Sequence, residues 1–296
     1  SGPMLKQAFI DGAVETGITI YDCGLASTPA MFMTTVDKKL AVTGGVMITA
    51  SHLPFNRNGI KFFTKDGGLE KADIAEILDI ANRGELPVDR AGGKCVEYDF
   101  MARYKAHLVE YIRSEVKADS FRRPLDGLRI IVDAGNGTGG FFVDVLEELG
   151  ANTTGSQFTE PDGHFPNHIP NPEDRKAMAS VCQAVVKNNA DLGIIFDTDV
   201  DRSAIVLRKG APINRNSLIA LIAAIILKEH PGSTIVTDSV TSDGLAEFII
   251  QHGGKHHRFK RGYKNVIDEG IRLNKSGEEC WLAIETSGHC ALRENF

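Results

Sequence analysis

Apolar residues along the chain follow two spacings, one helical and one extended. Residues 71–82 predict an amphipathic helix whose apolar face is formed by Ile74, Ile77, Leu78 and Ala81. Short apolar runs at 17–24, 44–50 and 192–196 predict buried strands. Because helix-like and strand-like segments alternate throughout, we predict an α/β fold. The other expected elements are helices over 3–16, 28–38 and 99–116, and a surface loop over 83–98.

Two segments are typical of domain boundaries. Residues 122–127 (RRPLDG) precede the strand and turn LRIIVDAGNGTGG and the helix FFVDVLEELGA, and residues 231–233 (PGS) precede a strand at 234–239. Each begins a new strand-to-helix unit, so we expect three related α/β domains, over 1–117, 118–230 and 231–296. The longest apolar run, 218–227, is too short to cross a bilayer and predicts a buried helix.

Composition narrows the class of protein. The 296 residues include 33 Lys and Arg against 39 Asp and Glu, and the net charge of −6 argues against a general nucleic-acid or membrane-surface role. The five cysteines form no CxxC pair, so we expect reduced thiols without metal or disulfide roles. Lys6, Asp11 and Glu15 interrupt any N-terminal apolar run, so we expect no signal peptide, and the reduced cysteines predict a cytoplasmic protein.

The sharpest motif is DTDVDR, directly after the apolar run 192–196. If the segment is extended, Asp197, Asp199 and Asp201 point the same way. Three carboxylates together repel one another unless a cation lies among them, and the apolar flanks disfavour a solvated acidic loop. A calcium EF-hand is excluded, because positions six and twelve hold Arg202 and Arg208 in place of Gly and Glu. Oxygen ligands in a compact loop favour Mg²⁺, with Arg202 suited to a phosphate oxygen.

A strand followed by DxD is also typical of phosphatases of the haloacid-dehalogenase type, in which the first Asp is the nucleophile. Those proteins usually carry Thr or Val at the fifth position, where this chain has Asp201. Their motif also usually follows the first strand of the domain, whereas Asp197 lies well downstream. A phosphatase of this type is therefore an alternative function for the chain.

A glycine-rich turn, GNGTGG at 135–140, follows a strand and precedes a helix. It satisfies GxGxxG, and Glu160 lies at the distance that a dinucleotide-binding fold requires. Such turns are common, however. We therefore favour a structural interpretation, in which the glycines let the helix pack closely on the sheet.

Two polar loops follow other predicted elements. In FPNHIPNPED, Asn171 to Asp174 are typical of a helix start capped by Asn171, which leaves Asn167 and His168 unexplained. In AIETSGHCAL, a strand ends at Glu285, and Ser287 follows. A carboxylate and a hydroxyl at a strand end can bind sugar hydroxyls, although a capped turn would have the same composition.

The stretch TASHLP places Ser51 and His52 at the end of another predicted strand, and Lys61 follows shortly after. No GxSxG elbow of a hydrolase is present. A serine near a Mg²⁺ site, with Lys61 and Arg202 available, fits a phosphoryl acceptor better. A phosphoserine carries roughly −1.5 to −2 charge at neutral pH and would add a metal ligand to the three aspartates.

Five motifs in this order resemble the α-D-phosphohexomutase family, in its phosphoglucomutase/phosphomannomutase branch: ITASHLPFNRNGIKFF, VDAGNGTGG, FPNHIPNPE, DTDVDR and ETSGH. The resemblance implies a fold of four α/β domains around one cleft. It implies a phosphoserine at Ser51, a phosphate-side arginine at Arg202, and proton transfer by His52 or Lys61, between which the sequence does not choose. It implies Mg²⁺ held by Ser51, Asp197, Asp199 and Asp201.

The resemblance also implies the substrate. Glu285, Ser287 and His289 would bind the sugar, and Tyr263 and Lys264 fall in a variable substrate loop of the family. The implied enzyme is an intramolecular phosphotransferase that interconverts hexose 1-phosphate and hexose 6-phosphate of glucose, mannose or both. Phosphoserine would give its phosphoryl group to the sugar, forming a bound 1,6-bisphosphate that turns over before the other phosphate returns to Ser51. Glucose 1,6-bisphosphate or mannose 1,6-bisphosphate would be the activator.

The chain departs from the family pattern in places. Leu53 replaces the Asn of ASHNP, which alters the loop but leaves Ser51 intact. Thr49, Glu285 and His289 favour the glucose/mannose branch over the glucosamine branches.

A GRDxR-like segment before residue 1 and an RxSGT-type fourth domain are not in the sequence, so we expect incomplete first and third domains and weak activity of this fragment alone. A non-catalytic sugar-phosphate binder is a further alternative.

Overall fold

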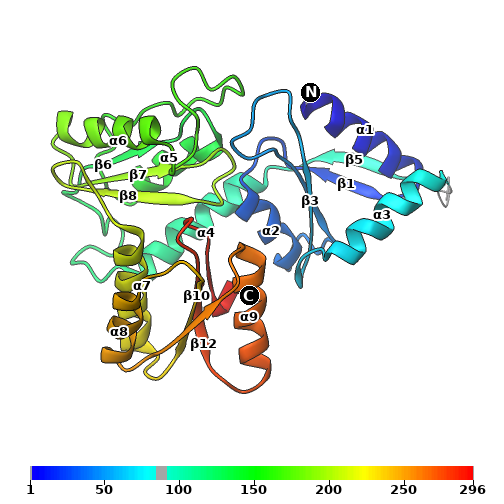
Figure 1. Ribbon diagram of the computed structural model, residues 1–296. Helices are drawn as coiled ribbons and strands as arrows, with labels where there is room; N and C mark the ends of the chain where they lie inside the picture. Colours follow the sequence, from blue (N-terminus) through cyan, green and yellow to red (C-terminus); the bar gives the residue numbers. More distant parts are fainter. Residues whose placement is uncertain (1, 85–91, 296) are drawn as a thin grey trace.

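The computed structural model describes residues 2–84 and 92–295, and in it the chain folds into three α/β units around a central helix, α4 (Phe100–Glu115) (Figure 1). The predicted α/β class is confirmed. The first unit lies on the right of Figure 1, the second at upper left and the third below. Each unit has one or two sheets with helices packed against them, and the loops that carry the predicted motifs lie where the units approach one another.

The first unit contains two small sheets. In one, β1 pairs in parallel with β5, and in the other β2, β3 and β4 are antiparallel. Its elements are α1 (Gly2–Glu15), β1 (Thr19–Asp22), α2 (Thr28–Val36), β2 (Gly45–Ile48), β3 (Ile60–Thr64), β4 (Gly67–Gly68), α3 (Lys71–Arg83) and β5 (Lys94–Glu97). The start of α2 is well buried, with Ser27 as its N-cap and Ala30 fully buried. The unit therefore presents the start of α2 from within its core.

Two expectations for this unit were wrong in part. The predicted loop over 83–98 contains β5, a strand whose four residues are all exposed, so it lacks the apolar signature of a buried strand. Residues 85–91 of that segment lie outside the described residues. The predicted apolar face of α3 is only half-buried, and Leu78 is 58% exposed. Capping explains α3 better: Glu70 and Asp73 form a capping box, and Gly84 closes the helix in the left-handed conformation.

The second unit is a four-stranded sheet between two helices, α5 and α6. Its elements are β6 (Ile130–Asp133), η1 (Thr138–Gly140), α5 (Phe141–Glu148), α6 (Arg175–Lys187), β7 (Leu192–Phe196), β8 (Ser203–Leu207) and β9 (Ala211–Pro212). The order is β6-β7-β8-β9, with only β6 and β7 parallel. Apolar side chains cover both faces, Ile131 and Ile195 toward α6 and Val132 and Phe196 toward α5. The loops after β6 and β7 consequently leave the same edge.

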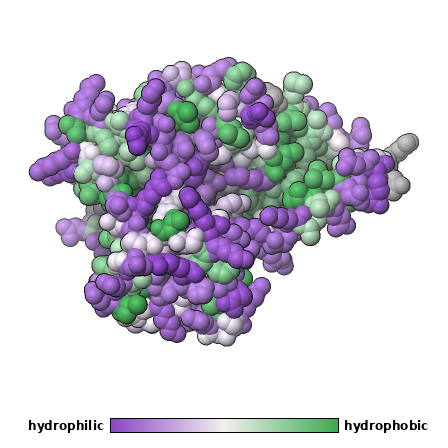
Figure 2. Space-filling model, in the orientation of Figure 1, coloured by the Kyte–Doolittle hydropathy of each residue, from purple (hydrophilic) through white to green (hydrophobic). Residues whose placement is uncertain are grey.

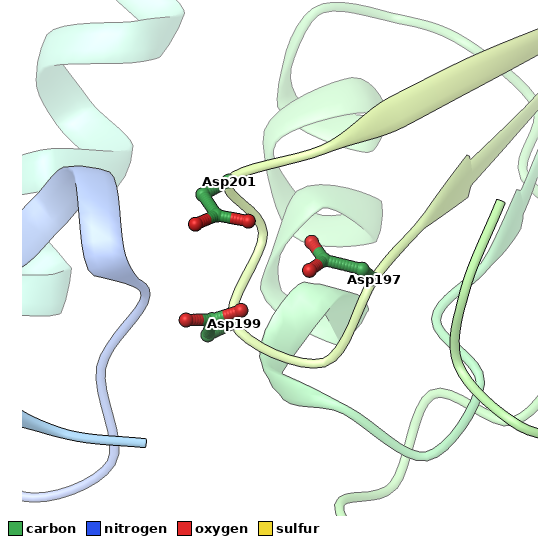
Figure 3. A group of neighbouring side chains, drawn as sticks. All are labelled: Asp197, Asp199 and Asp201. Carbon is green, nitrogen blue, oxygen red and sulfur yellow. The ribbon is translucent and has the colours of Figure 1, made fainter. Parts of the chain in front are cut away.

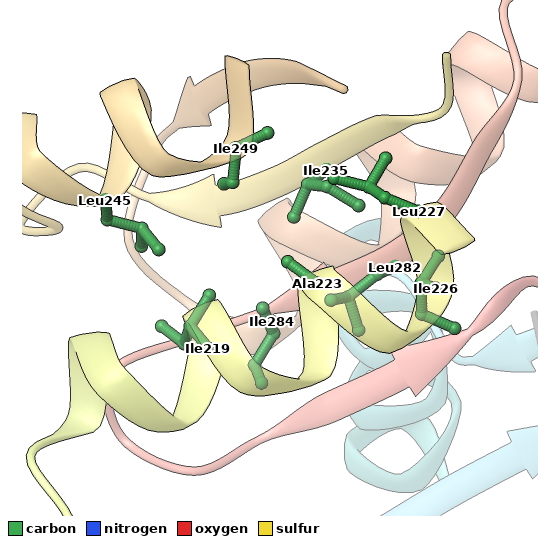
Figure 4. Close-up of a cluster of buried hydrophobic side chains, with 9 residues drawn as sticks. All are labelled: Ile219, Ala223, Ile226, Leu227, Ile235, Leu245, Ile249, Leu282 and Ile284. Carbon is green, nitrogen blue, oxygen red and sulfur yellow. The ribbon is translucent and has the colours of Figure 1, made fainter. Parts of the chain in front are cut away.

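The third unit repeats this plan. Its elements are α7 (Arg215–Glu229), β10 (Thr234–Asp238), α8 (Asp243–Gln251), β11 (Lys255–Phe259), α9 (Tyr263–Lys275), β12 (Cys280–Ile284), β13 (Cys290–Leu292) and η2 (Arg293–Asn295). The sheet order is β11-β10-β12-β13, with only β13 antiparallel. Figure 4 shows the core in which α7 and α8 pack against β10 and β12. The loop after β12 carries Glu285 out of this core.

Helix α7 differs from expectation in two ways. It is buried on one side only, because Leu221 and Ile225 are about half exposed, at 51% and 53%. The expected boundary at 230/231 assigns α7 to the second unit, whereas Ile219 and Ala223 of α7 belong to the core of the third, together with Ile235 of β10. The apolar residues of α7 therefore pack against the sheet of the third unit, whose strands follow α7 in the chain.

The surface seen in Figure 2 is largely hydrophilic, with apolar side chains gathered mainly over the first unit. The exposed apolar residues of that unit include Met4, Ile18 and Leu25. Among the described residues, no helix is long and apolar enough to cross a membrane. All five cysteines are free in this structure.

Candidate active site

The three aspartates of DTDVDR lie on a turn between β7 and β8. The turn is closed by the backbone N–H of Arg202, which donates to Oδ1 of Asp197 at 3.0 Å, and Val200 adopts a left-handed φ of 62°. The segment is therefore not extended, and the expected reason for convergence was wrong. The turn itself brings one oxygen of each carboxylate within 4.8 Å of the others (Figure 3).

Two threonines, one from the second unit and one from the first, hold this turn. Thr138 of the glycine-rich turn donates both its N–H and its hydroxyl to the carbonyl oxygen of Thr198, at 2.8 and 3.0 Å. Thr28, the first residue of α2, donates its N–H to the carbonyl of Asp199 and its hydroxyl to Oδ2 of Asp199. A Cβ on Gly137 would lie 2.6 Å from the Thr198 carbonyl oxygen, so this glycine permits close packing. The glycine-rich turn thus supports the aspartate turn, a contact that the structural interpretation of the sequence did not predict.

Two of the three carboxylates, those of Asp197 and Asp201, have strongly shifted pKa values. Burial, together with the charges of Asp201 and Asp199, raises the pKa of Asp197 to about 8. Burial also acts to raise the pKa of Asp201, but hydrogen bonds and charges from His289 and Lys61 outweigh it and hold that pKa well below its usual range. Lys61 bridges two of them, with Nζ 3.1 Å from Oδ2 of Asp199 and 2.9 Å from Oδ2 of Asp201. Burial lowers the pKa of Lys61, yet these two carboxylates raise it on balance.

The aspartate turn fits a divalent cation. Oδ1 of Asp199 is buried and accepts no hydrogen bond from any described residue, and Oδ1 of Asp201 accepts none but lies 3.7 Å from Nε2 of His289 and from Nε of Arg202. Oxygen atoms left unpartnered in a buried site are costly unless a ligand satisfies them. Three carboxylates within reach of one ion are the donor set that hard divalent cations prefer. The same cation would relieve the repulsion that raises the pKa of Asp197.

Ser51 lies against this turn. Its hydroxyl donates to Oδ2 of Asp197 at 3.3 Å and accepts from Nη2 of Arg202 at 2.9 Å. Its φ of 53° is left-handed, a conformation that a non-glycine residue adopts at a cost and that clusters at functional sites. Nδ1 of His52 lies 3.3 Å from the Ser51 hydroxyl and accepts from Nη2 of Arg202 at 2.9 Å. Burial and the charge of Arg202 lower the pKa of His52, so its ring is neutral.

Arg202 is held on two sides. Its Nε and Nη2 both donate to Oδ2 of Asp197, and its Nη1 donates to Oδ1 of Asn171 at 3.2 Å. Asn171 was predicted to cap the following helix, but α6 begins at Arg175 and its N-cap is Asp174. The amide of Asn171 instead holds Arg202 and accepts from the N–H of Glu173.

The loop after β12 brings Glu285, Ser287 and His289 to the same place. His289 Nε2 is 3.7 Å from Oδ1 of Asp201, and its Nδ1 is 2.8 Å from the Ser287 hydroxyl. Burial lowers the pKa of His289, but Asp201 and Glu285 raise it to about 9 on balance. Burial raises the pKa of Glu285, and hydrogen bonds from His289, the Gly262 N–H and Ser287 bring it below its usual range. The loop is therefore coupled to the aspartate turn by charge.

The two residues of the expected substrate loop differ in position. The ring of Tyr263 lies 5.1 Å from that of His289, measured between centroids. Lys264 instead forms ion pairs with Asp268 and, at 2.6 Å, with Oε1 of Glu70 in the first unit. Thus Tyr263 adjoins the sugar-loop candidates, whereas Lys264 links the first and third units.

Comparison with known families decides what this arrangement belongs to. Three family models match in succession: phosphoglucomutase/phosphomannomutase alpha/beta/alpha domain I over residues 1–87, domain II over 102–210 and domain III over 214–296. The chain belongs to the phosphoglucomutase/phosphomannomutase family. Within this family's plan, α7 falls in the stretch matched by domain III, in agreement with its packing.

Individual members of the phosphoglucomutase/phosphomannomutase family are similar along the whole chain. A phosphoglucomutase of Neisseria gonorrhoeae is 30% identical over 296 residues, and a phosphomannomutase/phosphoglucomutase of Pseudomonas putida is 31% identical over 297. A crystal structure of a family protein from Burkholderia thailandensis superimposes with a TM-score of 0.85 at 28% identity. All of this chain is covered in each case, but only 61%, 60% and 62% of the respective relatives. The chain therefore spans about three fifths of the length of these relatives.

The roles of two residues at this site were not predicted from the sequence. Thr28 lies in the stretch STPA, which resembles an ordinary helix start and is one in the structure. Asn171 was assigned to capping because Pro172 and two acids follow it. In both cases the partner lies far along the chain, 171 positions away for Thr28 and 31 for Asn171. Local sequence carries no signal of such contacts.

Proposed function

We propose that this chain forms the phosphoryl-transfer centre of a phosphohexomutase, which interconverts hexose 1-phosphate and hexose 6-phosphate. The observation that carries the proposal is the position of the Ser51 hydroxyl, which contacts both Arg202 and Asp197. A serine held by a guanidinium beside an acidic cation site is placed to accept and release a phosphoryl group. The names of the relatives, phosphoglucomutase and phosphomannomutase, support glucose and mannose phosphates as substrates.

We infer that the cation is Mg²⁺, held by Asp197, Asp199 and Asp201 and by an oxygen of phosphorylated Ser51. When bound, the ion would neutralise charge on the transferring phosphoryl group. The buried Oδ1 atom of Asp199, which accepts no hydrogen bond from the described residues, supports this assignment. Phosphorylation of Ser51 would place new negative charge beside Arg202, whose fork of donors suits phosphate oxygens.

The proposed step needs little covalent chemistry from the protein. The Oγ–P bond of phosphoserine breaks as a sugar hydroxyl forms the new O–P bond, and the proton of that hydroxyl passes to a nearby base. We assign the proton to His52, whose Nδ1 lies 3.3 Å from Ser51 Oγ and would first release the hydrogen bond that it accepts from Arg202. We assign Lys61 to charge neutralisation, because its Nζ contacts two carboxylates. Arg202 keeps the phosphoryl group in line.

The sugar would lie against the loop after β12. Glu285 and Ser287 offer oxygen atoms for sugar hydroxyls, and Tyr263 offers a ring beside His289. Transfer to one end of the sugar and return from the other end requires a 1,6-bisphosphate intermediate. We therefore propose glucose 1,6-bisphosphate or mannose 1,6-bisphosphate as the activator that first loads Ser51.

Loading of Ser51 tests the proposal directly. The chain is incubated with Mg²⁺ and glucose 1,6-bisphosphate, and the phosphorylated residue is located by peptide mass spectrometry. We expect one phosphoryl group, on Ser51, and none in Ser51→Ala. Arg202→Lys keeps the positive charge but loses the several N–H donors of the guanidinium group. We therefore expect phosphorylation of Ser51 to be roughly 100-fold slower, a loss typical of removing one positioned charged donor. Ser114→Ala, an exposed site on α4, is the matched control and is expected to load normally.

Other outcomes identify other functions. Release of inorganic phosphate that requires Asp197 but not Ser51 would indicate a phosphatase of the haloacid-dehalogenase type. Binding of hexose phosphate with no loading of Ser51 at any Mg²⁺ concentration would indicate a binding protein. Asp197 accepts three hydrogen bonds from the backbone and side chain of Arg202, and these disfavour Asp197 as a nucleophile.

A further inference from the structure

Thr28 connects the first unit to the aspartate turn of the second. Its N–H donates to the carbonyl oxygen of Asp199 at 2.8 Å, and its hydroxyl donates to Oδ2 of the same residue at 2.7 Å. Both residues are buried, with 8% of Thr28 and 1% of Asp199 exposed. Thr28 is thus the only described residue for which both a backbone and a side-chain hydrogen bond to Asp199 are found.

The two hydrogen bonds act on different parts of Asp199. The backbone bond fixes where the turn approaches α2, and the hydroxyl bond fixes which way the carboxylate is rotated. Oδ2 accepts from Thr28 and from Lys61, both residues of the first unit. Oδ1 accepts from none of the described residues, although it is buried. One oxygen is therefore satisfied by protein donors and the other is left for a ligand.

We propose that Thr28 is a positioning residue of the divalent-cation site: its hydroxyl holds Oδ2 of Asp199 so that Oδ1 is presented to the ion. The inference deepens the proposed function and rests on its cation site. Groups that hydrogen-bond to metal ligands set the orientation of those ligands, and their removal typically weakens metal affinity about 10- to 100-fold. The first unit would accordingly contribute to cation affinity without supplying an aspartate.

Substitution can separate this role from a merely structural one. Thr28→Val keeps the shape and the backbone N–H but removes the hydroxyl, and Thr28→Ser restores a hydroxyl. Thr34→Val is the matched control. Thr34 lies on the same helix and is 3% exposed, and its hydroxyl donates to the carbonyl oxygen of Met31 within that helix. Each of the three substitutions removes only the hydroxyl or only the methyl group of a threonine, and the two positions are buried to a similar extent.

The experiment measures the Kd of Mg²⁺ by isothermal titration into the full chain without sugar, and the Tm of each variant without cation. We expect Thr28→Val to raise the Kd about 10-fold or more, Thr28→Ser to stay within about 3-fold of the wild type, and Thr34→Val to leave the Kd unchanged even if its Tm falls. If Thr28→Val does not fold, Thr28→Ala is measured in its place with the same expectation.

Two results would overturn the inference. A folded Thr28→Val or Thr28→Ala variant with a wild-type Kd would show that the hydroxyl does not position Asp199. An equal rise of Kd in Thr28→Val and Thr34→Val would show only a general effect of packing in α2. Failure of the wild type to bind Mg²⁺ would overturn the cation site of the proposed function itself, so the two failures are distinguishable.

Discussion

His168 and Asp133 form a buried ion pair at the base of the loop that carries Asn171. Nε2 of His168 lies 3.0 Å from Oδ1 of Asp133, and its Nδ1 lies 3.0 Å from the carbonyl oxygen of Ile169. Both ring nitrogens thus face acceptors, which suits the protonated ring. Burial lowers the pKa of His168, but Asp133 and the Ile169 carbonyl raise it above its usual value on balance.

This pair predicts a stability that depends on pH. Because the folded chain binds the His168 proton more tightly than the unfolded chain, the contribution is complete below the unfolded pKa of about 6.5 and is lost as pH rises through the folded-state pKa. We expect His168→Gln to lower the free energy of unfolding by roughly 3 kcal/mol at pH 5.5, as for a broken buried pair, and by less at pH 9. Urea unfolding of both proteins at a series of pH values measures this.

The exposed His107 on α4 provides the control. His107→Gln should leave the unfolding free energy nearly unchanged at every pH. A loss on His168→Gln that is constant or grows with pH would contradict the assignment of a protonated ring.

At the scale of elements, the glycine-rich turn and the aspartate turn form one packed unit. Thr138 holds the carbonyl of Thr198, and Gly137 allows the approach that this bond requires. Helix α5 then begins directly after the turn, so its start is positioned by the same contact. The glycine-rich turn, which resembles a dinucleotide-binding motif, therefore holds the aspartate turn in position.

Gly137→Ala should damage both stability and the site. The added Cβ would lie 2.6 Å from the Thr198 carbonyl oxygen, a backbone atom that cannot rotate away. We expect a loss of about 2 kcal/mol in the free energy of unfolding, typical of overpacking, and weaker Mg²⁺ binding. Gly12→Ala on α1 has no atom within 4 Å of its added Cβ and should be neutral or slightly stabilising. Chemical denaturation of the two variants compares them, and equal effects would refute the steric argument.

Elements and site residues were predictable where the signal is local. The buried strand before Asp197 and the strand before Ser51 follow from short apolar runs, and the acidic and TASH motifs stand at their ends. Strand β5 was missed because all four of its residues are exposed and its partner, β1, is distant in the chain. Thr28 was missed for a related reason: its chemistry depends on docking between units, which no periodicity encodes.

At the scale of the whole molecule, Lys61 joins the first and second units. Its ammonium group lies between Asp199 and Asp201, which are 138 and 140 positions away in the chain. In the absence of a bound cation, this is a positive charge that offsets the repulsion among the three carboxylates. Docking of the two units therefore depends on the electrostatics of the site.

Lys61→Met should make that dependence visible. Removal of one partner of a largely buried charge pair is expected to cost about 2 kcal/mol and lower the Tm by about 4 °C without cation. The gap to the wild type should narrow as Mg²⁺ is added, because the ion supplies positive charge in its place. Differential scanning calorimetry across a Mg²⁺ series measures it. Lys65→Met removes an exposed lysine nearby and should change little; a gap unaffected by Mg²⁺ would contradict the argument.

The 171-residue separation between Thr28 and Asp199 has a consequence for biosynthesis. At elongation rates of 5–20 residues per second, Asp199 leaves the ribosome roughly 10 to 30 seconds after Thr28. During that interval Ser51 is already made, but the carboxylates and the arginine that surround it do not yet exist. If Ser51 accepts a phosphoryl group as proposed, a nascent chain cannot be phosphorylated there by this mechanism until the second unit has been translated.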